Sequence, residues 1–340
     1  MNILVLTFGC KLLEDYYSKC LKNIFDTDEN LLFTDISRLE HEMILRKIEY
    51  DKSESLAMNL IASVPVTNSV IDRINKIIKQ NCIDSIICLD TEAIWYVDSV
   101  KSQYCLNIPV YCLLSDISGI NRDFESISKY YVLSEYDRQK ALKAGIDTDK
   151  ITVSGLPGSS KAGAGISMHF DDDMCLFITD GNDFYRLAAC FDSISASSLR
   201  KMNFIVAVTQ NRDLCDIFNA RYYNSKNIRA VCVRNNLNDY IASADFAVVD
   251  TCTDDVMYSI INNIPLIVIE ENINSPSLLK FLNDRNLAFS VSKPEDVAEK
   301  LTRLVSNLFL RNAMVESQGE ITNTDSDNII RNDIINNLFT

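Results

Sequence analysis

Three carboxylates stand just after short apolar runs that predict buried strands. Asp116 follows the run Val110 to Leu114, and Asp90 and Glu92 follow the run Ser85 to Leu89. The carboxyl ends of parallel strands form the edge where α/β proteins bind ligands, and a carboxylate there can take a proton from a hydroxyl as a general base. The same positions suit an Asp that opens a loop or caps a helix. Asp116, Asp90 and Glu92 are therefore candidate catalytic residues, with a purely structural role as the alternative.

Histidine and cysteine show no arrangement that predicts a metal site. The chain has two histidines and eleven cysteines, and no two cysteines have the C-x-x-C spacing. We expect His41 and His169 to be surface residues, and the adjacent carboxylates Asp171–Asp173 cannot share one face. We therefore predict no bound metal and no cofactor, and reduced, mostly buried thiols as in a cytoplasmic protein.

The charge balance narrows the classes of partner. With 33 basic and 47 acidic residues, the formal charge is -14. Nucleic acid is excluded as an expected partner because neutralising phosphates needs clusters of Lys and Arg. No apolar run approaches the length of a membrane span, and the start MNILVLTFGCK lacks the basic segment of a signal sequence. We expect a cytoplasmic protein, with peripheral contact at the inner face of the membrane left open.

The elements that would position these residues alternate between short β-branched runs and amphipathic stretches of helical length, which is typical of α/β folds built on parallel sheets. Twelve runs predict strands: 3–7, 31–34, 85–89, 110–114, 130–133, 151–153, 175–179, 204–208, 228–231, 246–249, 266–269 and 288–291. Only nine glycines occur in 340 residues, and four lie between Gly155 and Gly165, which marks a linker. We predict two doubly wound domains, 1–157 and 171–315, joined by a linker at 158–170 and followed by a polar stretch and terminal helix at 316–340.

Several stretches resemble a known family. Ser134-Glu135, Gly145-Ile146, Lys150-Ile151 and Gly155-Leu156-Pro157 follow one another in the order seen at the end of the N-terminal domain in bacterial glycolipid glycosyltransferases. These are the monogalactosyldiacylglycerol synthases and processive diacylglycerol glucosyltransferases, relatives of the peptidoglycan lipid-intermediate N-acetylglucosaminyltransferase. Further similar segments lie in order between residues 84 and 306, at 84–91, 106–116, 227–245, 264–269 and 293–299.

The resemblance implies a GT-B-type fold, in which two Rossmann-like domains face each other, and a nucleotide-sugar donor, a UDP-sugar, held as substrate by the C-terminal domain. The resemblance implies four regions of donor contact. They are the first loop of each domain, the loop that contacts the base, and the helix that binds the ribose. The positions that match are Gly9, Thr179, Gly181, Thr209, Arg212, Val233, Arg234, Asp254 and Tyr258.

The chain departs from the family where donor phosphates bind. The first loop keeps a single glycine, Gly9, and lacks the family's histidine, while the loop after residue 179 keeps Gly181 but adds Asp180 and Asp183 where a pyrophosphate would lie. Near residue 250 both family glycines are missing and Tyr258 stands at the position of the ribose-binding Glu. The sequence therefore does not predict that the donor phosphates and ribose are bound by the same groups as in the family.

Two functions remain open. The first is a hexosyltransferase-type enzyme that moves a sugar from a UDP donor to a lipid-linked or cell-envelope acceptor by displacement at the anomeric carbon. The second is a catalytically inactive relative that keeps the fold and serves as a partner or scaffold. A shared fold cannot decide between them, because function depends on the site.

Overall fold

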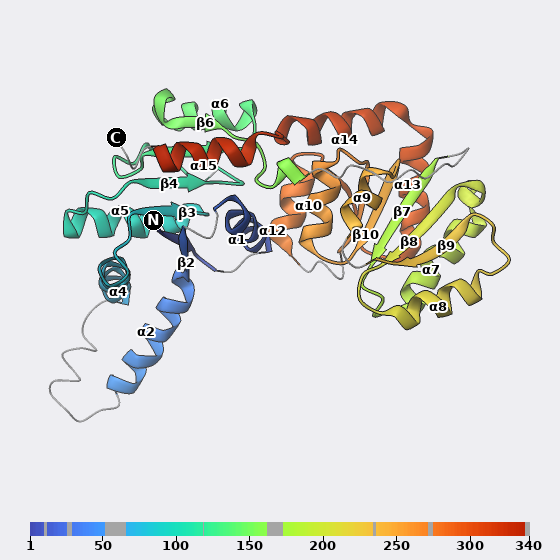
Figure 1. Ribbon diagram of the computed structural model, residues 1–340, viewed down its shortest axis with the longest axis horizontal. Coiled ribbons are helices and arrows are strands. Elements are labelled where there is room, and N and C mark those ends of the chain that lie inside the picture. Colours follow the sequence, from blue (N-terminus) through green and yellow to red (C-terminus); the bar gives the residue numbers. More distant parts are fainter. Residues whose placement is uncertain are drawn as a thin grey trace. The chain divides into compact units, whose positions relative to one another are not determined.

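The computed structural model of the protein describes residues 1–9, 12–25, 29–51, 66–117, 119–161, 173–233, 236–270 and 275–336. The chain forms two compact units (Figure 1). Unit 1 combines Met1–Pro157 with Asp325–Thr340, and unit 2 is Gly158–Thr324. The last helix of the chain thus belongs to the unit in which the chain begins.

Unit 1 is built on a six-stranded parallel sheet in the order β2-β1-β3-β4-β5-β6. Its inner strands are almost fully buried because helices cover both faces, which is why they appear in the sequence as continuous apolar runs. The strands are β1 (Asn2–Thr7), β2 (Asn30–Asp35), β3 (Ser85–Cys88), β4 (Val110–Leu113), β5 (Lys129–Val132) and β6 (Ile151–Val153).

The helices of unit 1 form two groups. Helices α2, α4 and α5 pack side by side, and α1 packs against α15 (Figure 1). The chain returns to unit 1 through Ser326, whose Oγ donates to the Leu156 carbonyl at 2.9 Å. The helices are α1 (Leu12–Ile24), α2 (Ile36–Asp51), α4 (Val66–Gln80), α5 (Thr91–Tyr104), α6 (Glu135–Lys143), the short η1 (Thr148–Lys150) and α15 (Ser326–Asn336).

Unit 2 contains a second six-stranded parallel sheet, in the order β12-β11-β10-β7-β8-β9. Its centre is a cluster of aromatic rings, in which Phe191 on helix α7 (Phe184–Ala196) contacts Phe177, Phe204 and Phe218. The strands are β7 (Met174–Thr179), β8 (Asn203–Val208), β9 (Ile228–Cys232), β10 (Phe246–Asp250), β11 (Leu266–Ile269) and β12 (Phe289–Val291).

The helices of unit 2 follow its strands in the usual alternation. The longest, α14, covers residues that include 316–321, the beginning of the stretch expected to be polar and irregular. The helices are α7 (Phe184–Ala196), α8 (Arg212–Arg221), α9 (Leu237–Ala242), α10 (Thr253–Ile261), α12 (Pro276–Asp284), α13 (Val297–Ser306), α14 (Leu308–Ile321) and the short η2 (Ser159–Lys161), η3 (Ser198–Lys201) and η4 (Pro294–Asp296).

Each sheet has one point where the strand order reverses. In unit 1 the first strand, β1, lies between β2 and β3, and in unit 2 the first strand, β7, lies between β8 and β10. The crevice outside the carboxyl ends of the two strands at such a switch point is where open α/β sheets bind ligands. The predicted fold class, two doubly wound α/β domains with a C-terminal helix, is confirmed, and the two switch points locate the candidate sites.

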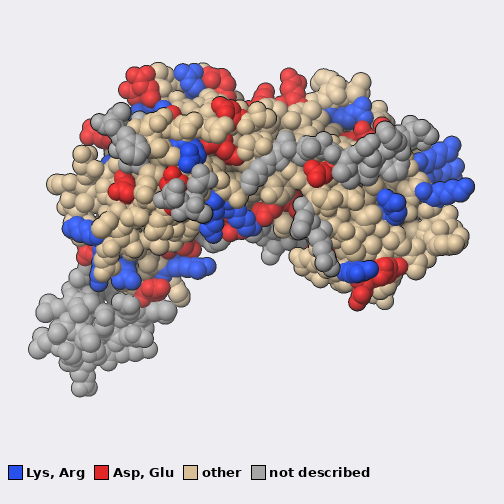
Figure 2. Space-filling model, viewed as in Figure 1, with Lys and Arg blue, Asp and Glu red and all other residues tan. Residues whose placement is uncertain are grey.

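The surface carries both signs of charge. On the face that Figure 2 shows, acidic and basic side chains are interspersed among neutral ones. Each cysteine within the described residues is a free thiol. No helix in those same residues has the length and apolar character needed to cross a membrane.

Candidate functional site

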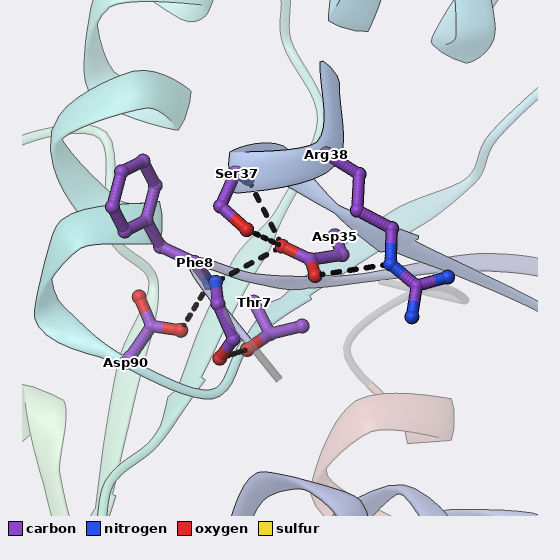
Figure 3. A network of polar contacts seen from close by, with 7 residues as sticks. Thr7, Phe8, Asp35, Ser37, Arg38 and Asp90 are labelled. Carbon is purple, nitrogen blue, oxygen red and sulfur yellow. Dashed lines mark hydrogen bonds and ion pairs between the residues drawn. The ribbon is translucent and has the colours of Figure 1, made fainter. Parts of the chain in front are cut away.

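Asp90 connects two elements at the switch point of unit 1 through hydrogen bonds to their backbone amides. It follows β3, and one carboxylate oxygen accepts the backbone N–H of Phe8 at 2.6 Å (Figure 3). The other accepts the backbone N–H of Ala93 at 2.7 Å. The first bond fixes the loop after β1 and the second caps helix α5. Burial is the largest influence on this side chain and raises the pKa of its carboxyl group. The structure thus uses both oxygens of Asp90 to join two elements, and its catalytic role stays a prediction.

Asp35 fixes the same loop from the other side (Figure 3). It ends β2, and its Oδ1 accepts the N–H of Gly9 at 2.9 Å and the N–H and hydroxyl of Ser37 at 3.0 and 2.7 Å, while Arg38 Nε lies 3.5 Å from Oδ2. Gly9 has a φ of +82°, a conformation that side chains other than glycine rarely adopt. The Gly9 amide, which a phosphate could have used, is bound to the protein's own carboxylate.

These contacts predict a pH dependence for Asp35. Burial, the largest single influence, raises its pKa, but the hydrogen bonds from Ser37 and Gly9 and the charge of Arg38 together outweigh burial and lower the pKa below 3.8. A lowered carboxyl pKa stabilises the folded state above the unfolded value, and this contribution is lost as the pH falls through the folded value. We expect Asp35→Asn to lower the unfolding free energy by about 1–3 kcal/mol at pH 7.

Urea unfolding of wild type and Asp35→Asn at a series of pH values measures this difference. It should shrink as the pH falls below the ordinary carboxyl pKa and vanish as the pH passes through the lowered pKa of Asp35 in the folded state. A difference that stays constant from neutral pH down to the acid range in which all carboxyl groups are protonated would contradict an electrostatic role for this side chain.

Asp116 and Glu92, the other candidate catalytic residues, are exposed. Asp116 follows β4, which pairs with β3, so it lies at the same sheet edge as Asp90. Glu92 lies in the first turn of α5, where its Oε2 accepts the Thr91 hydroxyl at 3.1 Å. Asp116 and Glu92 are thus exposed whereas Asp90 is buried, and a catalytic role for each of the three stays a prediction.

In unit 2, side-chain oxygens of the loop after β7 accept backbone N–H groups of this loop and of the first turn of α7. Thr179 Oγ1 accepts the N–H of Gly181 at 3.2 Å, Asp180 Oδ1 accepts that of Asn182 at 2.9 Å, and Asp183 Oδ1 accepts that of Arg186 at 3.0 Å. In phosphate-binding loops such amides point at the ligand instead. In this conformation the loop residues do not form an anion cradle.

Gly181 is required here by packing. Its φ is +85°, and a Cβ added at this position would lie 2.9 Å from Val208 Cγ1 and 3.0 Å from Asn211 Cβ. Asn211 also donates from Nδ2 to the Gly181 carbonyl at 3.0 Å. The glycine therefore lets the loop after β7 lie against the loop after β8, which is a sufficient structural reason for its presence.

A buried ion pair at this switch point was not among the residues singled out from the sequence. Arg186, on the first turn of α7, places Nη2 3.1 Å from Oδ1 of Asp250, the last residue of β10. The two side chains are 8% and 4% exposed. The pair brings a cation to the crevice between β7 and β10. An Arg on a helix face that is otherwise apolar, between Phe184 and Leu187, is the sequence signal that could have revealed it.

Helix α10 begins at the same crevice with little side-chain capping. Its N-cap residue, Cys252, makes no side-chain capping hydrogen bond. The next residue, Thr253, is buried, and its hydroxyl oxygen has no hydrogen-bond partner among the described residues. Asp255, one turn into the helix, accepts the Thr251 hydroxyl. Cys252 is exposed, but neighbouring atoms partly desolvate its thiol, and this effect, followed by the charge of Asp255, raises the pKa of the thiol to about 11.

The other candidate donor contacts lie along the carboxyl edge of the same sheet. Thr209 donates its N–H to the Thr179 carbonyl at 2.9 Å, which joins the ends of β7 and β8, and Val233 is buried just after β9. Arg212 is exposed at the first turn of α8. Asp254 and Tyr258 are half-buried, four residues apart on α10. Arg234 lies outside the described residues. The structure thus brings Thr179, Gly181 and Thr209 together.

Within the described residues, no group of three or more His, Cys, Asp or Glu side chains could hold a metal ion. What the switch point of unit 2 offers a ligand is a buried guanidinium, a helix N-terminus and a buried hydroxyl. These groups suit an anion.

Comparison with solved structures shows the type of fold. MurG from Acinetobacter baumannii is similar with a TM-score of 0.58 at 10% sequence identity, over 99% of both chains. A candidate UDP-N-acetylglucosamine 2-epimerase from Listeria monocytogenes has a TM-score of 0.52 at 12% identity, over 97% of this chain and 95% of that one. MnaA from S. aureus, solved with UDP, has a TM-score of 0.51 at 12% identity, over 99% and 96%.

No protein-family model matches the chain, and no curated protein matches it. At these identities the likeness to solved structures shows the fold, which is of the GT-B type with two Rossmann-like units in one chain. The glycolipid glycosyltransferase family that the sequence resembles stays a prediction.

Proposed function

We propose that the protein is a glycosyltransferase that binds a UDP-sugar in unit 2 and transfers the sugar to a lipid-linked or cell-envelope acceptor. The observation that supports this most directly is the concentration of anion-binding groups at the switch point between β7 and β10. Arg186 presents a guanidinium there that is already paired with Asp250, and helix α10 begins at Thr253, so the positive end of its dipole lies at this crevice. The fold likeness to MnaA, a protein solved with UDP, is consistent with this use.

In this proposal each group has a distinct task. Arg186 and the N-terminus of α10 bind the diphosphate, and their charge stabilises the UDP that departs when the glycosidic bond breaks. Tyr258 and Asp254 bind the ribose. Asp116, at the carboxyl edge of the unit 1 sheet, is the candidate base for a hydroxyl group bound at that edge. The protein acts in the cytoplasm, with peripheral contact at the inner face of the membrane where the acceptor is a lipid.

A second candidate function is favoured by the same loops. Asp180 and Asp183 bind the amides of the loop after β7, and Asp254 and Asp255 place negative charge on the first turn of α10. Such carboxylates oppose a diphosphate. A catalytically inactive relative of glycosyltransferases, acting as a partner or scaffold, would retain this fold without donor binding.

Calorimetric titration with UDP and UDP-sugars separates the two candidates. We expect UDP to bind, and Thr253→Val to weaken binding about tenfold because a hydrogen bond to a charged phosphate is lost. Tyr258→Ala should also weaken it. Thr302→Val on α13, whose hydroxyl donates to the Ala298 carbonyl, is the matched control and should leave the affinity unchanged.

Each outcome has a defined meaning. Wild-type protein that binds none of these ligands at millimolar concentration would reject the enzyme and favour the inactive relative. Binding that Tyr258→Ala leaves unchanged would show that the ribose does not lie at this part of α10.

A further inference from the structure

Unit 1 contains a cavity that the proposed chemistry does not use. Its volume is about 510 Å³, within the size range of small-molecule sites. It lies where α5 ends and where the chain enters β4 and β5, at the amino ends of these strands, so it is at the opposite sheet edge from Asp90 and Asp116. Its lining comes from 98–107 and 122–126: Asp98, Lys101, Ser102, Cys105, Leu106, Asn107, Arg122, Asp123, Phe124, Glu125 and Ser126.

The charges of this cavity cancel. Arg122 Nη2 lies 3.5 Å from Asp98 Oδ2, and Asp123 Oδ2 lies 3.0 Å from Lys150 Nζ just behind the lining. Lys101 donates to the carbonyls of Ile108 and Ser126 at 2.7 and 2.9 Å. With Glu125 on the exposed rim, three carboxylates are balanced by three cations. Neither a phosphate nor a polyamine would find the net opposite charge that it needs.

Arg122 is oriented by two aromatic rings, although its side chain is 56% exposed. The Arg122 guanidinium lies over the rings of Trp95 and Phe124, at 5.1 and 4.7 Å from their centroids, and these rings pack edge to face. A guanidinium fixed in this way presents its N–H donors in a set direction. Ser102 and Asn107, both exposed, add a hydroxyl and an amide.

We propose that this cavity binds a neutral, polyhydroxylated ligand, a mono- or disaccharide. Vicinal hydroxyl groups can both accept from the Arg122 fork and donate to carboxylates such as Asp98 without bringing net charge into a balanced site. The volume suits one or two sugar rings. The site would be a carbohydrate-binding position separate from the switch points and independent of whether unit 2 binds UDP.

The test is to titrate the full chain with glucose, galactose, N-acetylglucosamine and maltose in the absence of nucleotide. Saturation-transfer NMR and calorimetry detect the binding. Ser102→Trp fills the cavity from an exposed helix position and should weaken binding at least about tenfold. Gln103→Trp places the same bulk on the neighbouring exposed position outside the lining, and should change nothing. Asn107→Ala should weaken binding about threefold to tenfold through one lost hydrogen bond.

Three results would overturn the proposal. The first is that none of these sugars binds wild-type protein. The second is that they bind equally well to Ser102→Trp, which would place them elsewhere. The third is that spermidine or inorganic phosphate, but no sugar, binds in a manner that Ser102→Trp abolishes. Because UDP is absent throughout, none of these results bears on donor binding in unit 2.

Discussion

Arg186→Met is expected to lower the unfolding free energy by about 3–5 kcal/mol, the largest effect of any single substitution considered for unit 2. The carboxylate of Asp250 is 4% exposed and lies 3.1 Å from the guanidinium. Without Arg186 the Asp250 carboxylate either stays charged and buried with no cation beside it, or takes up a proton. Both alternatives lower the free energy of unfolding. Met fills a similar volume, so packing loss contributes little.

The double variant Arg186→Met, Asp250→Leu should recover most of this loss, because replacing both members of a buried pair removes the uncompensated charge. Arg221→Met is the matched control. Arg221 lies 2.9 Å from Asp192, but the two side chains are 44% and 59% exposed, and such a pair contributes about 1 kcal/mol or less. Urea unfolding followed by circular dichroism measures all three. If Arg186→Met cost no more than Arg221→Met, burial of the pair would have no energetic consequence.

Asp90→Ala is expected to lower the unfolding free energy by about 2–4 kcal/mol, the second largest effect. The substitution removes the N-cap of α5, a loss of about 0.5–2 kcal/mol, and leaves the Phe8 amide unsatisfied, a further loss of about 1–3 kcal/mol. Asp90→Asn keeps one carbonyl oxygen as an acceptor and should cost less. Thermal and urea unfolding give both values.

Asp183→Ala serves as the comparison. Asp183 is exposed and caps α7 by accepting the Arg186 N–H at 3.0 Å, so its loss should cost only the cap, about 0.5–2 kcal/mol. Equal losses for Asp90→Ala and Asp183→Ala would show that the bond from the Phe8 amide to Asp90 contributes nothing.

The strands could be predicted from the sequence because parallel strands covered on both faces form continuous apolar runs. The run 204–208 corresponds to β8 (Asn203–Val208) and the run 110–114 to β4 (Val110–Leu113), and the other ten agree similarly. The last residues of α14 were not predicted as helix, since Gln318 and its neighbours are polar. Gln318 is nevertheless fully buried. Its burial is tolerated because Nε2 donates to the carbonyls of Ile264 and Leu287, which are distant in sequence.

The candidate site could be predicted less completely. The sequence shows that Asp90 follows a strand, but its two amide partners belong to different elements, and only the folded sheet brings Phe8 to it. The strand order, which places β7 beside β10, is likewise invisible in the sequence. The position of Arg186 on an apolar helix face predicts a buried cation, but not that Asp250 is its partner. The position of Gly181 correctly marks the loop after β7. Its reason in the structure is packing, because a Cβ at this position would collide with Val208 and Asn211.

The return of the chain to unit 1 has a consequence for how the protein can be divided. Unit 2 is a domain inserted within unit 1, since Pro157 and Asp325 flank it and the hydrogen bond from Ser326 to Leu156 holds its two boundaries together. A fragment ending at residue 157 would lack α15, which packs on α1. Residues 158–324, by contrast, form one continuous segment with its own sheet, and a short loop joining 157 to 325 would restore unit 1 as a separate protein.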